Sequence, residues 1–170
     1  RRITTGIENT LVGAFAGTAL TDADYNTAIG RAALGSDTLG SKSVAIGREA
    51  LITQNFTTAT DVHNIAIGYN AGLSVTTGVQ NTLIGSLAGD ALTDADYNVA
   101  VGIEALSADT LGSGSTAIGR NALSTQNFTT ATTTYNTAVG DRAGLAVTTG
   151  TLNALIGGLA GDAINTGTHN

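Results

Sequence analysis

Two repeated pairs of aspartates are the residues that could bind a ligand most directly. The segment TDADYN occurs twice, with Asp22 and Asp24 in the first copy and Asp94 and Asp96 in the second. Two carboxylates two residues apart beside a turn can bind Ca²⁺ together with backbone oxygens, so these four residues are weak calcium candidates. A calcium ion needs about 6–8 oxygen ligands, and one such pair supplies few of them. We favour the alternative, an Asx-type turn with solvated carboxylates.

Side chains that could perform catalysis are few. The two histidines are His63 and His169, and Tyr135 stands in place of His63 in the second copy of its segment. The chain has no cysteine, so it lacks a thiol nucleophile, and no serine stands in a G-x-S-x-G motif. The glycines recur at the spacing of a repeat, which is typical of turns rather than of a phosphate-binding loop. The sequence therefore predicts no enzymatic activity and no cofactor.

The glycine spacing comes from a five-residue motif of the type NTAIG, which recurs along the whole chain. Its closing glycines are Gly13, Gly30, Gly47, Gly68, Gly85, Gly102, Gly119, Gly140 and Gly157. The coils between them are either short or long, in the order short, short, long, short, and this order then repeats as a four-coil super-repeat. The chain thus contains a partial coil (1–8), two four-coil blocks (9–80 and 81–152) and the start of a third block (153–170). A regular repeat of this kind is typical of solenoids.

The motif reads as a β-strand followed by a glycine turn. Counting each coil from its Asn or Ser as position 0, position 2 is Ala or Leu, position 3 is Ile or Val and position 7 is Ala. No helix of ordinary length fits beside a strand and two turns within one such coil. The sequence predicts an all-β fold: a parallel β-roll, or β-solenoid, of nine 17- or 21-residue coils forming one array over residues 1–170.

The predicted strand is apolar or small on both faces, with positions 1 and 3 on one face and positions 0 and 2 on the other. A strand of this kind is covered on both sides, and the cover we expect is another copy of the chain. We therefore predict a parallel homotrimer with this strand nearest its axis. The residues assigned to the trimer or core are those of position 3: Val12, Ile29, Ile46, Ile67, Ile84, Val101, Ile118, Val139 and Ile156.

Other columns of the repeat predict how the coil is filled. Where position 8 is Gly, position 11 is a large apolar residue, and where position 8 is Leu in a short coil, position 11 is Asp37 or Asp109. One large apolar side chain per coil is what a narrow core requires. Thr at position 12 and Ala or Gly at position 14 predict a second strand and a second turn. The Asn residues of position 0 should hydrogen-bond from coil to coil, and the 21-residue coils, with Phe56 and Phe128, should form lateral bumps.

Composition and charge exclude several classes of function. The net charge is −6, and the seven basic residues are scattered, which argues against a nucleic-acid partner. No apolar run approaches the ~20 residues of a membrane-spanning helix. The chain shows no signal peptide, starts with Arg1 and begins in mid-coil, so we expect a segment of a longer array.

The motif resembles repeats of two known groups of proteins. SVAIG followed three residues on by Ala, as in Ser43 to Ala50, resembles the head repeats of trimeric autotransporter adhesins of the YadA type. The NTAIG and T-T-G-x-x-N variants resemble repeats of phage tail-fibre proteins, and the resemblance covers the chain from Thr4 to Asn170. It implies a left-handed parallel β-roll, three chains around one axis and a role in attachment.

These observations lead to two hypotheses about function. The first is an extracellular fibre segment of a cell-surface adhesin or of a phage tail fibre on a virion, which spaces and presents a receptor-binding tip. Its partners would be further copies of the chain and, through flanking regions, a host receptor or glycan. The second is an ice- or glycan-binding solenoid with a regular Thr/Asn face. Three-fold association would favour the first, and a flat, exposed Thr face on a monomer would favour the second.

Overall fold

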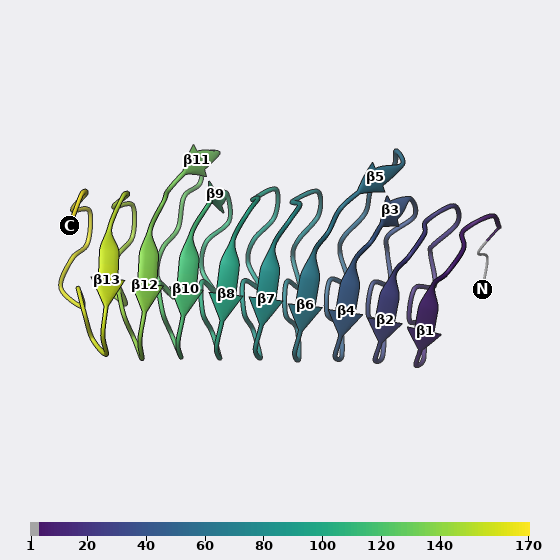
Figure 1. Cartoon of the computed structure of the whole chain (residues 1–170), viewed down its shortest axis with the longest axis horizontal. Helices are drawn as coiled ribbons and strands as arrows, with labels where there is room; N and C mark the ends of the chain where they lie inside the picture. The colour runs from purple at the N-terminus through teal and green to yellow at the C-terminus, as the bar shows by residue number, and fades with distance from the viewer. Residues whose placement is uncertain (1–3) are drawn as a thin grey trace.

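A computed structural model describes residues 4–170 as a stack of coils. The coils follow one another in chain order along one axis, so β1 and β13 lie at opposite ends of the resulting rod (Figure 1). The strands are β1 (Thr10–Val12), β2 (Thr27–Ile29), β3 (Gly40–Ser41), β4 (Val44–Ile46), β5 (Thr60–Asp61), β6 (Ile65–Ile67), β7 (Thr82–Ile84), β8 (Val99–Val101), β9 (Gly112–Ser113), β10 (Thr116–Ile118), β11 (Thr132–Thr133), β12 (Thr137–Val139) and β13 (Ala154–Ile156).

One sheet runs the length of the rod. It has nine parallel strands in the order β1-β2-β4-β6-β7-β8-β10-β12-β13, each formed by positions 1 to 3 of its motif. Equivalent positions pair from coil to coil, as in Thr10 with Thr27 and Val12 with Ile29. The predicted all-β parallel solenoid of nine coils is therefore confirmed, and residues 4–170 contain no helix.

The predicted second strand is wrong for most coils. At position 14 a strand forms only where a 21-residue coil follows, in the pairs β3–β5 and β9–β11, which project from the side of the rod (Figure 1). Elsewhere the neighbouring segments are joined by backbone hydrogen bonds that form no strand, such as Thr21 N to Thr38 O at 3.0 Å. The extra residues of the long coils supply the length that a paired strand needs, whereas the short coils turn there at once.

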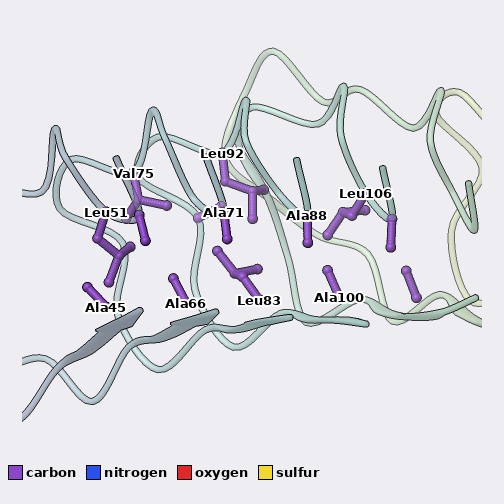
Figure 2. Close-up of a cluster of buried hydrophobic side chains, with 14 of the residues drawn as sticks. Ala45, Leu51, Ala66, Ala71, Val75, Leu83, Ala88, Leu92, Ala100 and Leu106 are labelled. Carbon is purple, nitrogen blue, oxygen red and sulfur yellow. The ribbon is translucent and has the colours of Figure 1, made fainter. Parts of the chain in front are cut away.

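The interior of the rod is narrow and filled mostly by small side chains. Ala45, Ala66 and Ala100 of the sheet face Ala71 and Ala88 of position 7 across it (Figure 2), and all five are fully buried. The predicted alternation between positions 8 and 11 is also confirmed. A Cβ on a position-8 glycine, Gly17, would lie 2.7 Å from Leu11 Cδ2 and 2.9 Å from Leu20 Cδ1, so glycine leaves the space that these leucines fill.

The closing glycine of the motif is required by the close approach of successive coils. Gly47 has φ +134°, and a Cβ there would lie 2.2 Å from the backbone oxygen of Gly68 in the next coil. This backbone conformation is unfavourable for residues with a Cβ. The glycine therefore sets the spacing of the strands as well as the turn.

Candidate functional site

The aspartates proposed as calcium candidates connect neighbouring coils. Asp24 Oδ1 accepts a hydrogen bond from Ile7 N at 2.8 Å, and Asp22 accepts one from Thr5 Oγ1. The second pair repeats this arrangement, since Asp94 accepts from Thr77 Oγ1 and Asp96 from Val79 N, both at 2.7 Å. The carboxylates thus bond to the preceding coil instead of closing an Asx-type turn. In residues 4–170 no group of three or more His, Cys, Asp or Glu side chains is placed to hold a metal ion.

The two histidines and the remaining polar surface form no enclosed site. His63 and His169 are both exposed, and the ring Nδ1 of His169 lies 3.3 Å from the hydroxyl of its neighbour Thr168. Residues 4–170 contain no pocket. None of the elements that these residues form is a helix long and apolar enough to cross a membrane.

The Asn residues of position 0 form the predicted ladder. Asn81 Nδ2 donates to Ala95 O in its own coil at 2.7 Å, and Asn81 Oδ1 accepts from Asn98 N of the next coil at 2.9 Å. Asn26, Asn64, Asn98, Asn136 and Asn153 repeat this pattern. The ladder is buried, so the position-0 asparagines do not contribute to an exposed Thr/Asn face.

A buried polar network interrupts the apolar interior once in each block. Asp37 Oδ1 accepts from Gly40 N and Phe56 N, both at 3.0 Å, and Asp37 Oδ2 accepts from Gln54 Nε2 at 2.6 Å. Gln54 also accepts from the ladder residue Asn64 at 2.9 Å. Asp109, Gln126, Phe128 and Asn136 repeat the network in the second block. The sequence pattern marked Asp37 and Asp109 as exceptions at position 11 but did not identify their glutamine partners, Gln54 and Gln126.

The position-3 residues lie on the outer side of the nine-stranded sheet. Val12, Ile29, Ile118 and Ile156 are exposed, and Ile46, Ile67, Ile84, Val101 and Val139 are half-buried. The core of the single chain is formed instead by positions 2 and 7, together with large apolar side chains from position 8 or 11, so the assignment of position 3 to that core is wrong. The reason is the strand alternation, which turns position 2 inward and positions 1 and 3 outward.

This outer face is the most distinctive surface of the molecule. We define the outer face as positions 1 and 3 of the nine strands, which contain only Thr, Val, Ile and Ala and no charged side chain. At ~4.8 Å per strand and ~3.3 Å per residue it measures about 40 Å by 10 Å, on the order of 400 Å². Continuous apolar patches of this size often mark interaction sites.

The distribution of exposed apolar side chains supports the same surface. Counted from position 0, every exposed large apolar side chain in residues 4–170 falls between positions −2 and 6, on the outer face or directly beside it. These are Ile7, Val12, Phe15, Tyr25, Ile29, Ile65, Tyr69, Tyr97, Ile103, Ile118, Tyr135, Leu152, Ile156 and Leu159. Outside positions −2 to 6, residues 4–170 expose no large apolar side chain, so the exposed apolar residues concentrate on the part of the rod that includes the outer face.

All the basic residues beside the outer face in residues 4–170 are paired with carboxylates of the same chain. Arg31 contacts Glu49 of the next coil at 2.7 Å, and Arg120 Nε contacts Asp141 Oδ1 at 2.8 Å. The hydrogen bond from Arg120, followed by its charge, holds the pKa of Asp141 below its usual value. These exposed pairs lie outside positions 1 and 3, so the outer face itself carries no charged side chain.

The buried carboxylate of Asp90 is expected to make the stability of the rod depend on pH. Its Oδ1 is buried without a hydrogen-bond partner, and burial, together with the charge of Glu104, raises the pKa of Asp90 above 3.8. Because the pKa of Asp90 is higher in the folded than in the unfolded chain, protonated Asp90 stabilises the fold at a pH below the ordinary pKa of 3.8. This stabilisation is lost as the pH rises through the folded-state pKa. We expect Asp90→Asn to be at least as stable as the parent at pH 7, with its advantage disappearing in acid.

Melting temperatures measured between about pH 3 and pH 8 check this expectation. Asp61→Asn is the control, because Asp61 is exposed and pairs with Lys42 at the surface. Parallel melting-temperature profiles for Asp90→Asn and the parent would contradict the role assigned to Asp90.

Comparison of this chain with models of protein families, with curated proteins and with solved structures finds no match. The geometry of the chain itself therefore has to indicate its function. The surface that the geometry favours is the outer face.

Proposed function

We propose that this chain is a structural segment of an extracellular fibre, in which parallel copies pack through the outer face as a homotrimer. The fibre belongs to a cell-surface adhesin or to a phage tail fibre, and it spaces and presents a receptor-binding tip. The observation that carries the proposal is the uncharged outer face, around which the exposed large apolar side chains of residues 4–170 gather.

The physical reason for association is the cost of leaving this face in water. Burial of apolar surface stabilises a protein by roughly 25 cal/mol per Å², so an open outer face forgoes several kcal/mol in each copy. Parallel packing around one axis brings like coils together, and it covers the Ile and Val columns of every chain at once. The number of three copies comes from the resemblance of the repeats to adhesin heads.

The remaining surface suits a spacer. The rod contains no pocket in the part that the structure describes, and nine strands at ~4.8 Å give it a length of about 40 Å. Each coil pairs only with the coils before and after it. Such a segment therefore holds its two ends at a fixed separation, and length is added by adding coils.

The proposal predicts the mass of the protein in solution. Light scattering should give a particle of three chains, each of 16.9 kDa. Ile46→Asp combined with Ile118→Asp places two carboxylates on the outer face, where association would bury them, so this variant should lose the trimer. Ile46→Thr combined with Ile118→Thr is gentler, because Thr already occupies position 1 of the same face, and it should weaken association while the coil stays folded.

Thr58→Asp combined with Thr130→Asp is the matched control. Both residues are exposed in the projecting segments of the 21-residue coils, away from the outer face. This variant should keep the mass and circular dichroism spectrum of the parent. A well-folded parent monomer, or an unchanged mass and stability in the Asp variant, would refute the proposal.

A binding solenoid remains the second candidate, because Thr occupies position 1 in five of the nine strands of the flat outer face. The other four strands carry Val44, Ile65, Val99 and Ala154 at this position. Binding of ice or a glycan there requires the face to stay open. A monomer in light scattering that also slows ice recrystallisation, or binds a glycan array, would therefore replace the fibre proposal with this one.

A further inference from the structure

The two projecting segments of the rod carry a feature that the outer face does not explain. We define the lateral segments as residues 53–61 and 125–133, which contain the additional residues of the 21-residue coils. They end in β5 and β11, which project from the rod once in each block (Figure 1). A repeated projection is a position at which the fibre can present chemical groups to its surroundings.

Each lateral segment contains the tripeptide Asn-Phe-Thr. The copies are Asn55 to Thr57 and Asn127 to Thr129, and they are the only Asn-x-Ser/Thr sequences among the 170 residues. Asn-x-Ser/Thr is the acceptor sequence for N-linked glycosylation. The tripeptide is short, so its structural setting decides whether it can carry a sugar.

The two side chains that define the acceptor sequence are accessible in the fold. Asn55 and Thr57 are exposed, whereas Phe56 between them is 7% exposed and anchors the segment. Asn55 Oδ1 accepts a hydrogen bond from Thr38 Oγ1 at 3.1 Å. Among the hydrogen bonds of residues 4–170, Asn55 Nδ2 and the Thr57 hydroxyl have none. The amide nitrogen that would carry a sugar is therefore free.

The second lateral segment has the same geometry. Asn127 and Thr129 are exposed, Phe128 is 6% exposed, and Asn127 Oδ1 accepts from Thr110 Oγ1 at 3.1 Å. The asparagines of the position-0 ladder differ in burial and in the bonding of their Nδ2, as Asn64 shows. Asn64 is fully buried, and its Nδ2 donates to Gln54 Oε1 and Gly78 O. The asparagines of the lateral segments are thus exposed and begin an Asn-x-Thr sequence, whereas the ladder asparagines are buried and do not begin one.

We propose that Asn55 and Asn127 are N-glycosylation sites, modified by an N-glycosyltransferase that uses a diphosphate-activated sugar. In this transfer the bond between the sugar C1 and the phosphate oxygen breaks, and C1 bonds to the amide Nδ2. The diphosphate leaves with the electron pair of the broken bond, and the proton that the amide loses passes to a basic group of the transferase. No oxidation or reduction is involved.

The backbone of the acceptor sequence is held by the neighbouring coils. Asn55 N donates to Thr76 O at 3.0 Å, and Phe56 N donates to Asp37 Oδ1 at 3.0 Å. The transferase therefore acts before the coil closes, and the folded coil accommodates the sugar because Asn55 is exposed and its Nδ2 is unbonded. The lateral segments lie away from the outer face, so the sugars do not obstruct it. Four coils separate equivalent sites, which places sugars about 19 Å apart along the rod.

Intact-mass measurement and peptide mapping of the protein purified from the organism that produces it test the proposal. The expected result is a sugar on Asn55 and a sugar on Asn127, with the other asparagines unmodified. Thr57→Ala should abolish the modification at Asn55 and leave Asn127 modified, and Thr57→Ser should retain both. These two variants keep Asn55 and its hydrogen bond with Thr38, so a change in mass reports the acceptor sequence and not a loss of fold.

An unmodified mass for the parent chain would overturn the inference. It would also be overturned if the sugar of Asn55 persisted in Thr57→Ala, or if sugars were found on asparagines outside the two acceptor sequences instead. All three results leave the proposed assembly through the outer face untouched, because no residue of that face belongs to the lateral segments.

Discussion

Replacing Gly47 with alanine is expected to lower the free energy of unfolding by about 2–6 kcal/mol. A φ of +134° is unfavourable for a residue with a Cβ, which costs about 1–3 kcal/mol. The new methyl group would also lie 2.2 Å from Gly68 O, so the two coils must separate, and overpacking of this kind costs about 1–3 kcal/mol more. Chemical denaturation of the variant and the parent measures the difference.

Two other glycines separate these causes. Gly157 has φ +124° but no atom within 4 Å of an added Cβ, so Gly157→Ala in this chain should show the strain alone. At Gly158 an added Cβ would come no closer than 3.8 Å to any atom, and φ lies outside the range that strains a side chain, so Gly158→Ala should be nearly neutral. Equal stabilities for Gly47→Ala and Gly158→Ala would show that the closing glycine does not set the coil spacing.

Replacing Asp37 with alanine is expected to destabilise the rod by about 2–5 kcal/mol. The carboxylate accepts hydrogen bonds from Gly40 N, Phe56 N and Gln54 Nε2. Its removal leaves the two backbone donors without an acceptor, and Gln54 Nε2 keeps only its 3.2 Å bond to Ser43 Oγ. An unsatisfied buried polar group costs about 1–3 kcal/mol, and partial rearrangement reduces the sum. The unfolding midpoint in urea, read by circular dichroism, is the measurement.

The second block supplies an internal replicate. Asp109 makes the equivalent three contacts, so Asp109→Ala should cost as much as Asp37→Ala. Asp61→Ala removes an exposed carboxylate paired with Lys42 and should change stability by less than about 1 kcal/mol. If Asp37→Ala were as mild as Asp61→Ala, the network would not hold the long coil in place.

The interior of the coil could be predicted from the sequence because it depends on volume. Position 7 must be small where two layers meet, and Gly17 must be small where Leu11 and Leu20 fill the same space. Both constraints repeat in every coil or block, so they appear as columns in the aligned repeats. Strand alternation likewise placed positions 1 and 3 on one face before the structure showed it to be the outer one.

The turns could not be predicted in the same way. Tyr25, Lys42 and His63, each at position −1, have φ values of +59°, +64° and +57°, although such residues rarely adopt this conformation. Neighbouring coils hold it in place, as Tyr25 N does by donating to Ile7 O at 3.1 Å. The preference of an isolated residue therefore gives no signal where the stacking of coils decides the backbone.

The candidate sites were harder to predict than the fold. The sequence placed Asp22 and Asp24 beside a turn, but their partners, Thr5 and Ile7, lie one full coil earlier and become neighbours only through the stacking. The contact between Asp37 and Gln54 depends in the same way on the coil closing. Side-chain partners in a solenoid are set by the period, so a local motif alone does not identify them.

The coil-to-coil ladder determines how the rod responds to tension. The hydrogen bonds of the nine-stranded sheet join successive coils along the long axis, and no strand bonds beyond its two neighbours. A pull on both ends therefore loads the terminal coil first and peels the coils off one after another, as in a zipper. Each released 17-residue coil adds on the order of 55 Å of extended chain, and each 21-residue coil on the order of 70 Å. The rod thus behaves as a graded extensible tether whose every fourth step is longer than the other three.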